Sequence, residues 1–114
     1  MVLFKTVELE YEARLSACDG SPDPDAGGKA EWKRYGDDTE RLEVKLWRLG
    51  IPDGATVYIS ISHRPVGSVT VSDGRARLLI EGGEGAAVPE AHEQDLLRVE
   101  SGGGAVLEGT FRVD

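Results

Sequence analysis

Apolar and polar residues alternate along the first part of the chain. The apolar odd positions are Leu3, Val7, Leu9, Tyr11, Ala13 and Leu15, and most of the even positions between them carry Thr, Glu or Arg. Because successive side chains of a β-strand point to opposite faces, this spacing predicts a strand with one buried and one solvated face. Such one-sided strands are typical of antiparallel sheets.

The same alternation returns in later segments, each ended by a cluster of Gly, Pro or Asp. It predicts strands over residues 29–35, 41–49, 56–62, 68–72, 75–81, 96–100 and 106–113. The mixed alternation of residues 29–35 suits an edge strand, whereas 41–49 is typical of a central one. The first strand is followed by residues 19–28, whose Asp, Pro and Gly content predicts a long exposed loop.

Glycine, proline and aspartate residues predict two turns and one irregular position within a strand. Asp73 and Gly74 predict a two-residue type I′ turn, in which both residues need positive φ. Residues 64–67, with Pro65, predict another turn. Gly109 lies inside the last strand and predicts a bulge or a close backbone contact.

About eight antiparallel strands fit a single all-β domain over residues 1–114. They pack as a two-layer β-sandwich with Greek-key-like connections or as a barrel. The sandwich is favoured, because segments 19–28 and 82–94 look like connections between sheets, the second with a helical turn over residues 90–93. Aliphatic residues are expected to fill the core, with both Trp residues at its edge or in a surface groove.

The net charge of the chain disfavours some classes of binding partner. Twenty-one acidic and thirteen basic residues give a net charge of −8, which repels phosphate backbones and anionic lipid. Nucleic acid and membrane surfaces are therefore not expected as partners. With no long apolar segment and no signal peptide, the chain is expected to be cytoplasmic if it is native from Met1, and secreted or surface-bound if a leader was removed.

Residues that could carry chemistry are few. Cys18 is the only cysteine, which excludes an intrachain disulfide and predicts a half-buried, unreactive thiol. Ser62 and His63 come nearest to a nucleophile and base, but neighbours on a strand point to opposite faces and no nucleophile elbow accompanies them. We therefore predict a protein that is not an enzyme and binds no cofactor.

The acidic loop offers a calcium-loop hypothesis. Oxygen-bearing side chains occur at alternating positions, at Asp19, Ser21, Asp23 and Asp25. Pro24 stands where such loops need Gly, and Ala30 where they need a closing carboxylate. A Pro-stiffened connector is the simpler interpretation.

Exposed aromatic residues offer a second hypothesis. Trp47 and Tyr58 are predicted to point outward and would form one patch if their strands paired across the turn at residues 52–54. With His63 they would make a surface for a ligand or partner. The alternative is that Lys and Arg stems cover them.

Part of the first half resembles a known family. Ala13 to Leu15, the Asp/Pro loop, Ala26 to Trp32 and Leu42 to Leu46 follow in an order that resembles the opening of CHRD-type domains. The resemblance implies a β-sandwich related in architecture to the Greek key of superoxide dismutases. The family's His-x-His element has no counterpart, since the strand ending at His63 holds one histidine, so the resemblance implies no metal role.

The sequence thus favours a non-catalytic structural or protein-interaction module. A protein partner or a second copy would dock on a strand edge, and the apolar Val2 and Phe4 favour a homo-oligomer. One alternative is a carbohydrate-binding module that uses Trp47 and Tyr58. Another is an enzyme of unrecognised type with His63 or His92 beside a carboxylate in a deep pocket.

Overall fold

The computed structural model describes residues 6–82 and 88–113, and the described chain is all-β. Its strands are β1 (Val7–Ala17), β2 (Gly27–Tyr35), β3 (Glu40–Trp47), β4 (Thr56–Ile61), β5 (Arg64–Thr70), β6 (Ala76–Glu81), β7 (Leu96–Ser101) and β8 (Gly104–Val113). The expected all-β fold of antiparallel strands is confirmed. Within the described ranges, no helix has the length and apolar character to cross a membrane.

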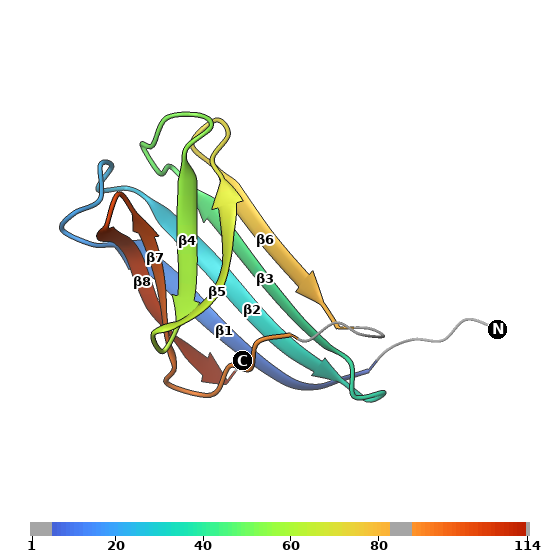
Figure 1. The fold of residues 1–114 in the computed structure, drawn as a ribbon. Coiled ribbons are helices and arrows are strands. Elements are labelled where there is room, and N and C mark those ends of the chain that lie inside the picture. Colours follow the sequence, from blue (N-terminus) through green and yellow to red (C-terminus); the bar gives the residue numbers. More distant parts are fainter. Residues whose placement is uncertain (1–5, 83–87, 114) are drawn as a thin grey trace.

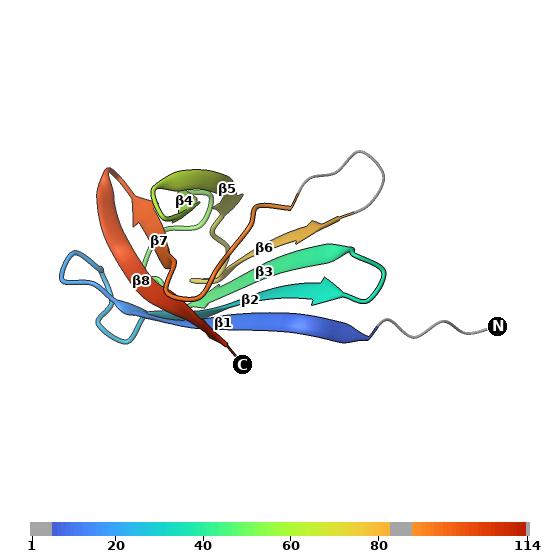
Figure 2. The same cartoon turned by 90° about the horizontal axis from the view of Figure 1, so that it is seen from below.

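The eight strands form one sheet in the order β5-β4-β7-β8-β1-β2-β3-β6. This sheet curls into two layers, with β4, β5 and β7 facing β1, β2, β3 and β6, while β8 turns the corner (Figures 1 and 2). β5 and β6 are the two end strands of the sheet. In the turn that connects them, Ser72 and Arg75 form an isolated β-bridge. The fold is therefore the barrel-like form of the predicted architecture, nearly closed on itself.

The connections follow a Greek-key order. β4, β5 and β6 succeed one another around the fold, and β7 returns to lie beside β4. β6 and β7 lie in opposite layers, so the chain passes from one layer to the other between them, as expected. The loop after β1 does not, because β1 and β2 pair directly as antiparallel neighbours.

Inward-facing residues of both layers fill the core. The largest fully buried side chains are Trp32, Phe111, Leu42, Leu49, Ile59, Ile61, Leu97, Leu107, Val44, Val57, Val71 and Val99. Trp32 is only 1% exposed, so its expected place at the core edge is wrong. Its ring stacks on Tyr11, with centroids 5.6 Å apart, and the Arg34 guanidinium lies 5.3 Å from its centroid.

Two other expectations about strands are wrong. β2 is central rather than an edge, since it pairs with β1 and β3 along its length. Its mixed outward residues are accommodated because they form ion pairs along β2 and with Glu10 and Glu12 of β1. The turn expected at residues 64–67 lies instead at Ser62 and His63, whose φ values are +48° and +67°, and Pro65 lies within β5.

Two local predictions that rest on glycine and turn residues are confirmed. Asp73 and Gly74 have φ values of +54° and +71°, which confirms the two-residue turn. A Cβ on Gly109 would overlap the carbonyl oxygen of Arg14, which confirms the close contact. The helical turn expected at 90–93 is wrong: the Asp95 amide donates to the His92 carbonyl oxygen across a tight turn in which Gln94 has a φ of +73°.

Candidate functional site

The outer face of β1, β2, β3 and β6 carries charged side chains in rows set by the strand register. Glu12, Glu31 and Glu43 lie directly opposite one another across β1, β2 and β3. A row of cations borders them on one side, formed by Arg14, Lys29, Lys45 and Arg77. Lys33 and Arg41 border them on the other side. Like charges directly opposite repel, so this face depends on attraction between the rows.

That attraction is visible in the contacts of Glu31. Its carboxylate lies 3.1 Å from the ammonium of Lys29 and 3.3 Å from that of Lys33. Burial disfavours the charged form of Glu31, but the hydrogen bonds and charges of these two lysines outweigh burial and lower its pKa. The charged side chains of the outer face therefore form ion pairs between neighbouring rows.

Glu43 is the most buried charged residue of this outer face, with 8% of its surface exposed. It accepts a hydrogen bond from Nε of Arg77 at 2.7 Å, and Arg41 and Lys45 each approach it to 3.8 Å. The carboxylate ties β6 to β3 and orients Arg77. The sequence did not reveal this cluster, since the pairing of β3 with β6 is not local.

The two ends of the sheet differ in how they are protected. β5 carries Pro65, and Val66 is an extra residue where the ladder with β4 shifts register. Both features discourage the addition of another strand. β6 contains no Pro, and its ladder with β3 runs from Ala76 to Glu81 without a shift.

β5 does not cover β6 in the plane of the sheet, because the two strands belong to opposite layers (Figure 2). They touch through side chains: a Cβ on Gly67 of β5 would lie 3.1 Å from Cδ2 of Leu78. β6 is therefore a regular strand whose outer edge forms no ladder with any described strand.

Trp47 lies at the end of β3 beside a depression of about 630 Å³. The depression is lined by Lys45, Leu46, Trp47, Thr70, Ser72, Arg75, Ala76 and Arg77. The Trp47 side chain is 40% exposed, so the prediction that it points outward is confirmed. Its indole lies against Gly27, where a Cβ would come within 2.8 Å of Nε1.

Tyr58 is also outward, with 58% exposure, and lines a separate depression with His63 and Glu100. β3 and β4 are not neighbours in the sheet, so Trp47 and Tyr58 do not form one patch. The turn between them leads from one layer to the other instead of joining paired strands. The structure therefore brings Tyr58 and His63 together and leaves Trp47 with the cations of β3 and β6.

The acidic loop is organised by its own hydrogen bonds. The Ser21 hydroxyl donates to the Asp23 carbonyl oxygen at 2.8 Å, and the Asp25 amide donates to Oδ1 of Asp23 at 2.8 Å. No group of three or more His, Cys, Asp or Glu side chains suited to a metal ion occurs in the described part of the chain. Calcium binding by Asp19, Ser21, Asp23 and Asp25 stays a prediction.

Two of the residues considered for catalysis, Ser62 and His92, hold Asp95 in place. Ser62 donates its hydroxyl hydrogen bond to Oδ1 of Asp95 at 2.8 Å, and the His92 amide donates to Oδ2 at 2.9 Å. Burial opposes ionisation of Asp95, but these two hydrogen bonds and the nearby charges outweigh it and lower its pKa. This tie anchors the β4–β5 turn to the segment before β7.

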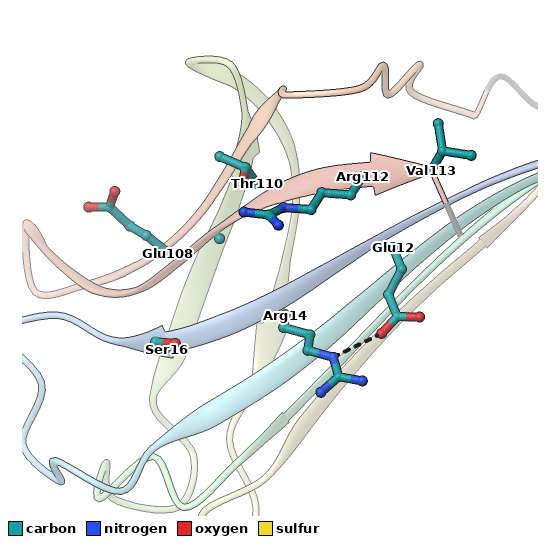
Figure 3. Close-up of a pocket in the computed structure, with 8 residues that line it drawn as sticks. Glu12, Arg14, Ser16, Glu108, Thr110, Arg112 and Val113 are labelled. Carbon is teal, nitrogen blue, oxygen red and sulfur yellow. Dashed lines mark hydrogen bonds and ion pairs between the residues drawn. The ribbon is translucent and has the colours of Figure 1, made fainter.

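β1 and β8 leave a polar groove of about 480 Å³ on their outer side. Figure 3 shows Arg14 turned toward Glu12, with Thr110 and Arg112 projecting from β8. Near the end of β1, the Cys18 thiol lies 3.6 Å from the Glu108 carboxylate. Burial and then the negative charge of Glu108 raise the pKa of this thiol, which favours its protonated, unreactive form.

Comparison of the sequence with family models and with curated proteins finds no relatives. No protein-family model matches the chain, and no curated protein matches it in sequence. The resemblance to CHRD-type domains stays a prediction. Function can therefore be inferred only from the surfaces of the chain itself.

Proposed function

We propose that this protein is a non-catalytic interaction module that associates with a second copy of itself through the free edge of β6. The observation that carries the proposal is the side-chain pattern of this unprotected edge. Arg77, Leu79 and Glu81 share the outer face, and Leu78 and Ile80 share the inner one. Val2 and Phe4, which also favour association, lie outside the described residues.

The pattern of β6 is self-complementary. An antiparallel pair of β6 strands with its two-fold axis at Leu79 sets Arg77 of each copy opposite Glu81 of the other. The same register places Leu78 opposite Ile80 and the two Leu79 side chains against each other. Opposite charges and aliphatic pairs facing across strands each stabilise a sheet.

A dimer formed this way would join the two β1-β2-β3-β6 layers into one wider sheet. Backbone hydrogen bonds supply much of the binding in such edge additions, and the side-chain pairs set the register. Because β6 has only six residues, the buried surface is small and the dimer is expected to be reversible.

Charge-reversal variants test this register. Glu81→Arg and Arg77→Glu each set like charges opposite each other, so each protein alone is expected to be monomeric in sedimentation velocity. Mixed in equal amounts, the two variants are expected to form a heterodimer, because both cross-strand pairs are then restored. Glu93→Arg makes the same charge change as Glu81→Arg at an exposed residue outside β6, so it is the matched control and is expected to dimerise like the native protein.

Arg77→Glu also removes the closest partner of Glu43, so its fold is checked by circular dichroism. Leu79→Lys gives a second test, because it places two ammonium groups at the centre of the pair while Arg77 stays in place. Since Leu79 lies opposite Glu43 in the ladder with β3, the fold of this variant is checked in the same way. A native protein that is monomeric at high concentration, or a mixture that stays monomeric while both variants are folded, would overturn the proposal.

A further inference from the structure

We propose that the depression beside Trp47 is a binding site for an anionic saccharide, a pyranose that carries a carboxylate or sulfate group. This inference does not depend on self-association through β6. It rests on the meeting of an aromatic platform, accessible cations and hydroxyl groups at one place on the outer surface.

The platform is the indole of Trp47. Gly27 lies on the neighbouring strand at the position paired with Trp47, and any side chain there would collide with the indole at 2.8 Å. The ring is thus supported by β2 on one side while 40% of the residue stays exposed. A flat, supported aromatic face stacks well on the apolar C–H face of a pyranose.

The cations are Lys45 of β3 and Arg75, which directly precedes β6. Leu46 pairs with Ala76, so the next step of the ladder places Arg75 beside Trp47. The Arg75 guanidinium has no hydrogen bond or ion pair with any residue in the described ranges. Lys45 is 58% exposed at its side chain and reaches Glu43 only at 3.8 Å.

These cations gather in a chain with a net charge of −8. A positive site on such a molecule selects a small anion, because the rest of the surface repels a long polyanion such as nucleic acid. The Arg75 guanidinium can donate two parallel hydrogen bonds to two oxygens of a carboxylate or sulfate. Thr70 and Ser72 line the far side of the depression and offer hydroxyls to the sugar.

The depression is of the size expected for a small ligand. Its volume of about 630 Å³ lies within the usual range of small-molecule sites. It is open to solvent beside the partly exposed Trp47, so one or two units of a short anionic saccharide are the expected occupants. Arg77 lines the depression, but its guanidinium is hydrogen-bonded to Glu43, so we do not expect it to bind the saccharide.

Tryptophan fluorescence and calorimetry test the site with named probes. Trigalacturonic acid carries carboxylates, a heparin-derived disaccharide carries sulfates, and maltotriose is the neutral control. The charged probes are expected to quench Trp47, while buried Trp32 keeps its emission and reports the fold. We expect maltotriose to bind at least about tenfold more weakly, since it leaves Arg75 without a partner.

Two variants locate the binding. Trp47→Ala is expected to abolish it in calorimetry, and Arg75→Gln is expected to weaken it about tenfold, the loss of one charged hydrogen-bonded contact. Tyr58→Ala removes the exposed aromatic of the other depression and is expected to change nothing. Arg75→Gln leaves residues 77–81 intact, so its dimerisation reports on the β6 proposal separately.

The proposal fails if neither charged probe binds at millimolar concentration. It also fails if maltotriose binds as tightly as the charged sugars, or if Trp47→Ala or Arg75→Gln leaves the affinity unchanged. Tighter binding of a single-stranded DNA oligomer through the same residues would replace the saccharide by a nucleic acid and overturn the proposal as well.

Discussion

Single residues determine how closely the strands approach one another. Gly109 lets β8 cross β1 where a Cβ would overlap the Arg14 carbonyl oxygen, and Gly27 does the same for the Trp47 indole. The first contact is with backbone, which cannot swing aside, whereas the second is with a side chain. Glycine in a strand interior usually weakens the strand, so its presence at these positions has a packing reason.

Gly109→Ala is therefore expected to destabilise the protein by about 1–3 kcal/mol, because β8 must shift away from β1 to make room. Urea denaturation measures the change. Gly104→Ala in the same strand is the control, since a Cβ at that position would have nothing within 4 Å, and it is expected to be nearly neutral. Equal stability of the two variants would contradict the close approach.

His63 makes a second prediction at this scale. It is exposed and has a φ of +67°, a conformation that costs a residue with a Cβ more than it costs glycine. His63→Gly is expected to be more stable than His63→Ala by about 1 kcal/mol in thermal or urea unfolding. If His63→Ala were the more stable of the two, the two-residue turn would not have the backbone described here.

At the scale of elements, the fold is held by ties between segments that are distant in sequence. Asp95 receives hydrogen bonds from Ser62 and from the His92 amide, and thereby fixes the β4–β5 turn against the entry to β7. The interactions that lower its pKa exist only in the folded protein. They stabilise the fold where Asp95 is ionised, and this contribution is lost as the pH falls through its folded pKa.

Asp95→Asn is expected to lower the free energy of unfolding at neutral pH by about 1–3 kcal/mol, because an amide replaces a charged acceptor of two hydrogen bonds. The deficit relative to the native protein should shrink as the pH falls into the acid range. Ser62→Ala removes one of the two bonds and should give a smaller deficit. Urea unfolding at several pH values measures these differences, and a deficit that grows in acid would contradict the lowered pKa.

Elements were predictable from sequence where the signal was local. The alternation of Leu42, Val44 and Leu46 predicts the buried face of β3, and Asp73 and Gly74 predict their turn. The turn at Ser62 and His63 escapes prediction because it contains none of the Gly, Asn or Asp residues that mark a two-residue hairpin turn, and Pro65 gives the stronger turn signal. β2 resembles an edge strand in sequence because alternation reports which face is buried, not how many neighbours pair with it.

At the scale of the whole molecule, the sites depend on which strands become neighbours. The cations beside Trp47 meet only because β6 pairs with β3, and Trp47 and Tyr58 separate because β3 and β4 lie in different layers. Outward-pointing Trp47 and Tyr58 could be predicted, but these groupings could not. The same topology leaves β5 and β6 as the sheet ends, with Pro65 on one and an unprotected strand on the other.

Amide hydrogen exchange of the native protein at low and high concentration tests the β6 interface most directly. We predict that amides on the outer edge of β6, between Arg77 and Glu81, exchange more slowly as concentration rises, while those of β5 do not change. Strand pairing shields amides from solvent, so the effect should follow the dimer population. Exchange from β6 that is independent of concentration over a range in which the molar mass doubles would contradict the proposed interface.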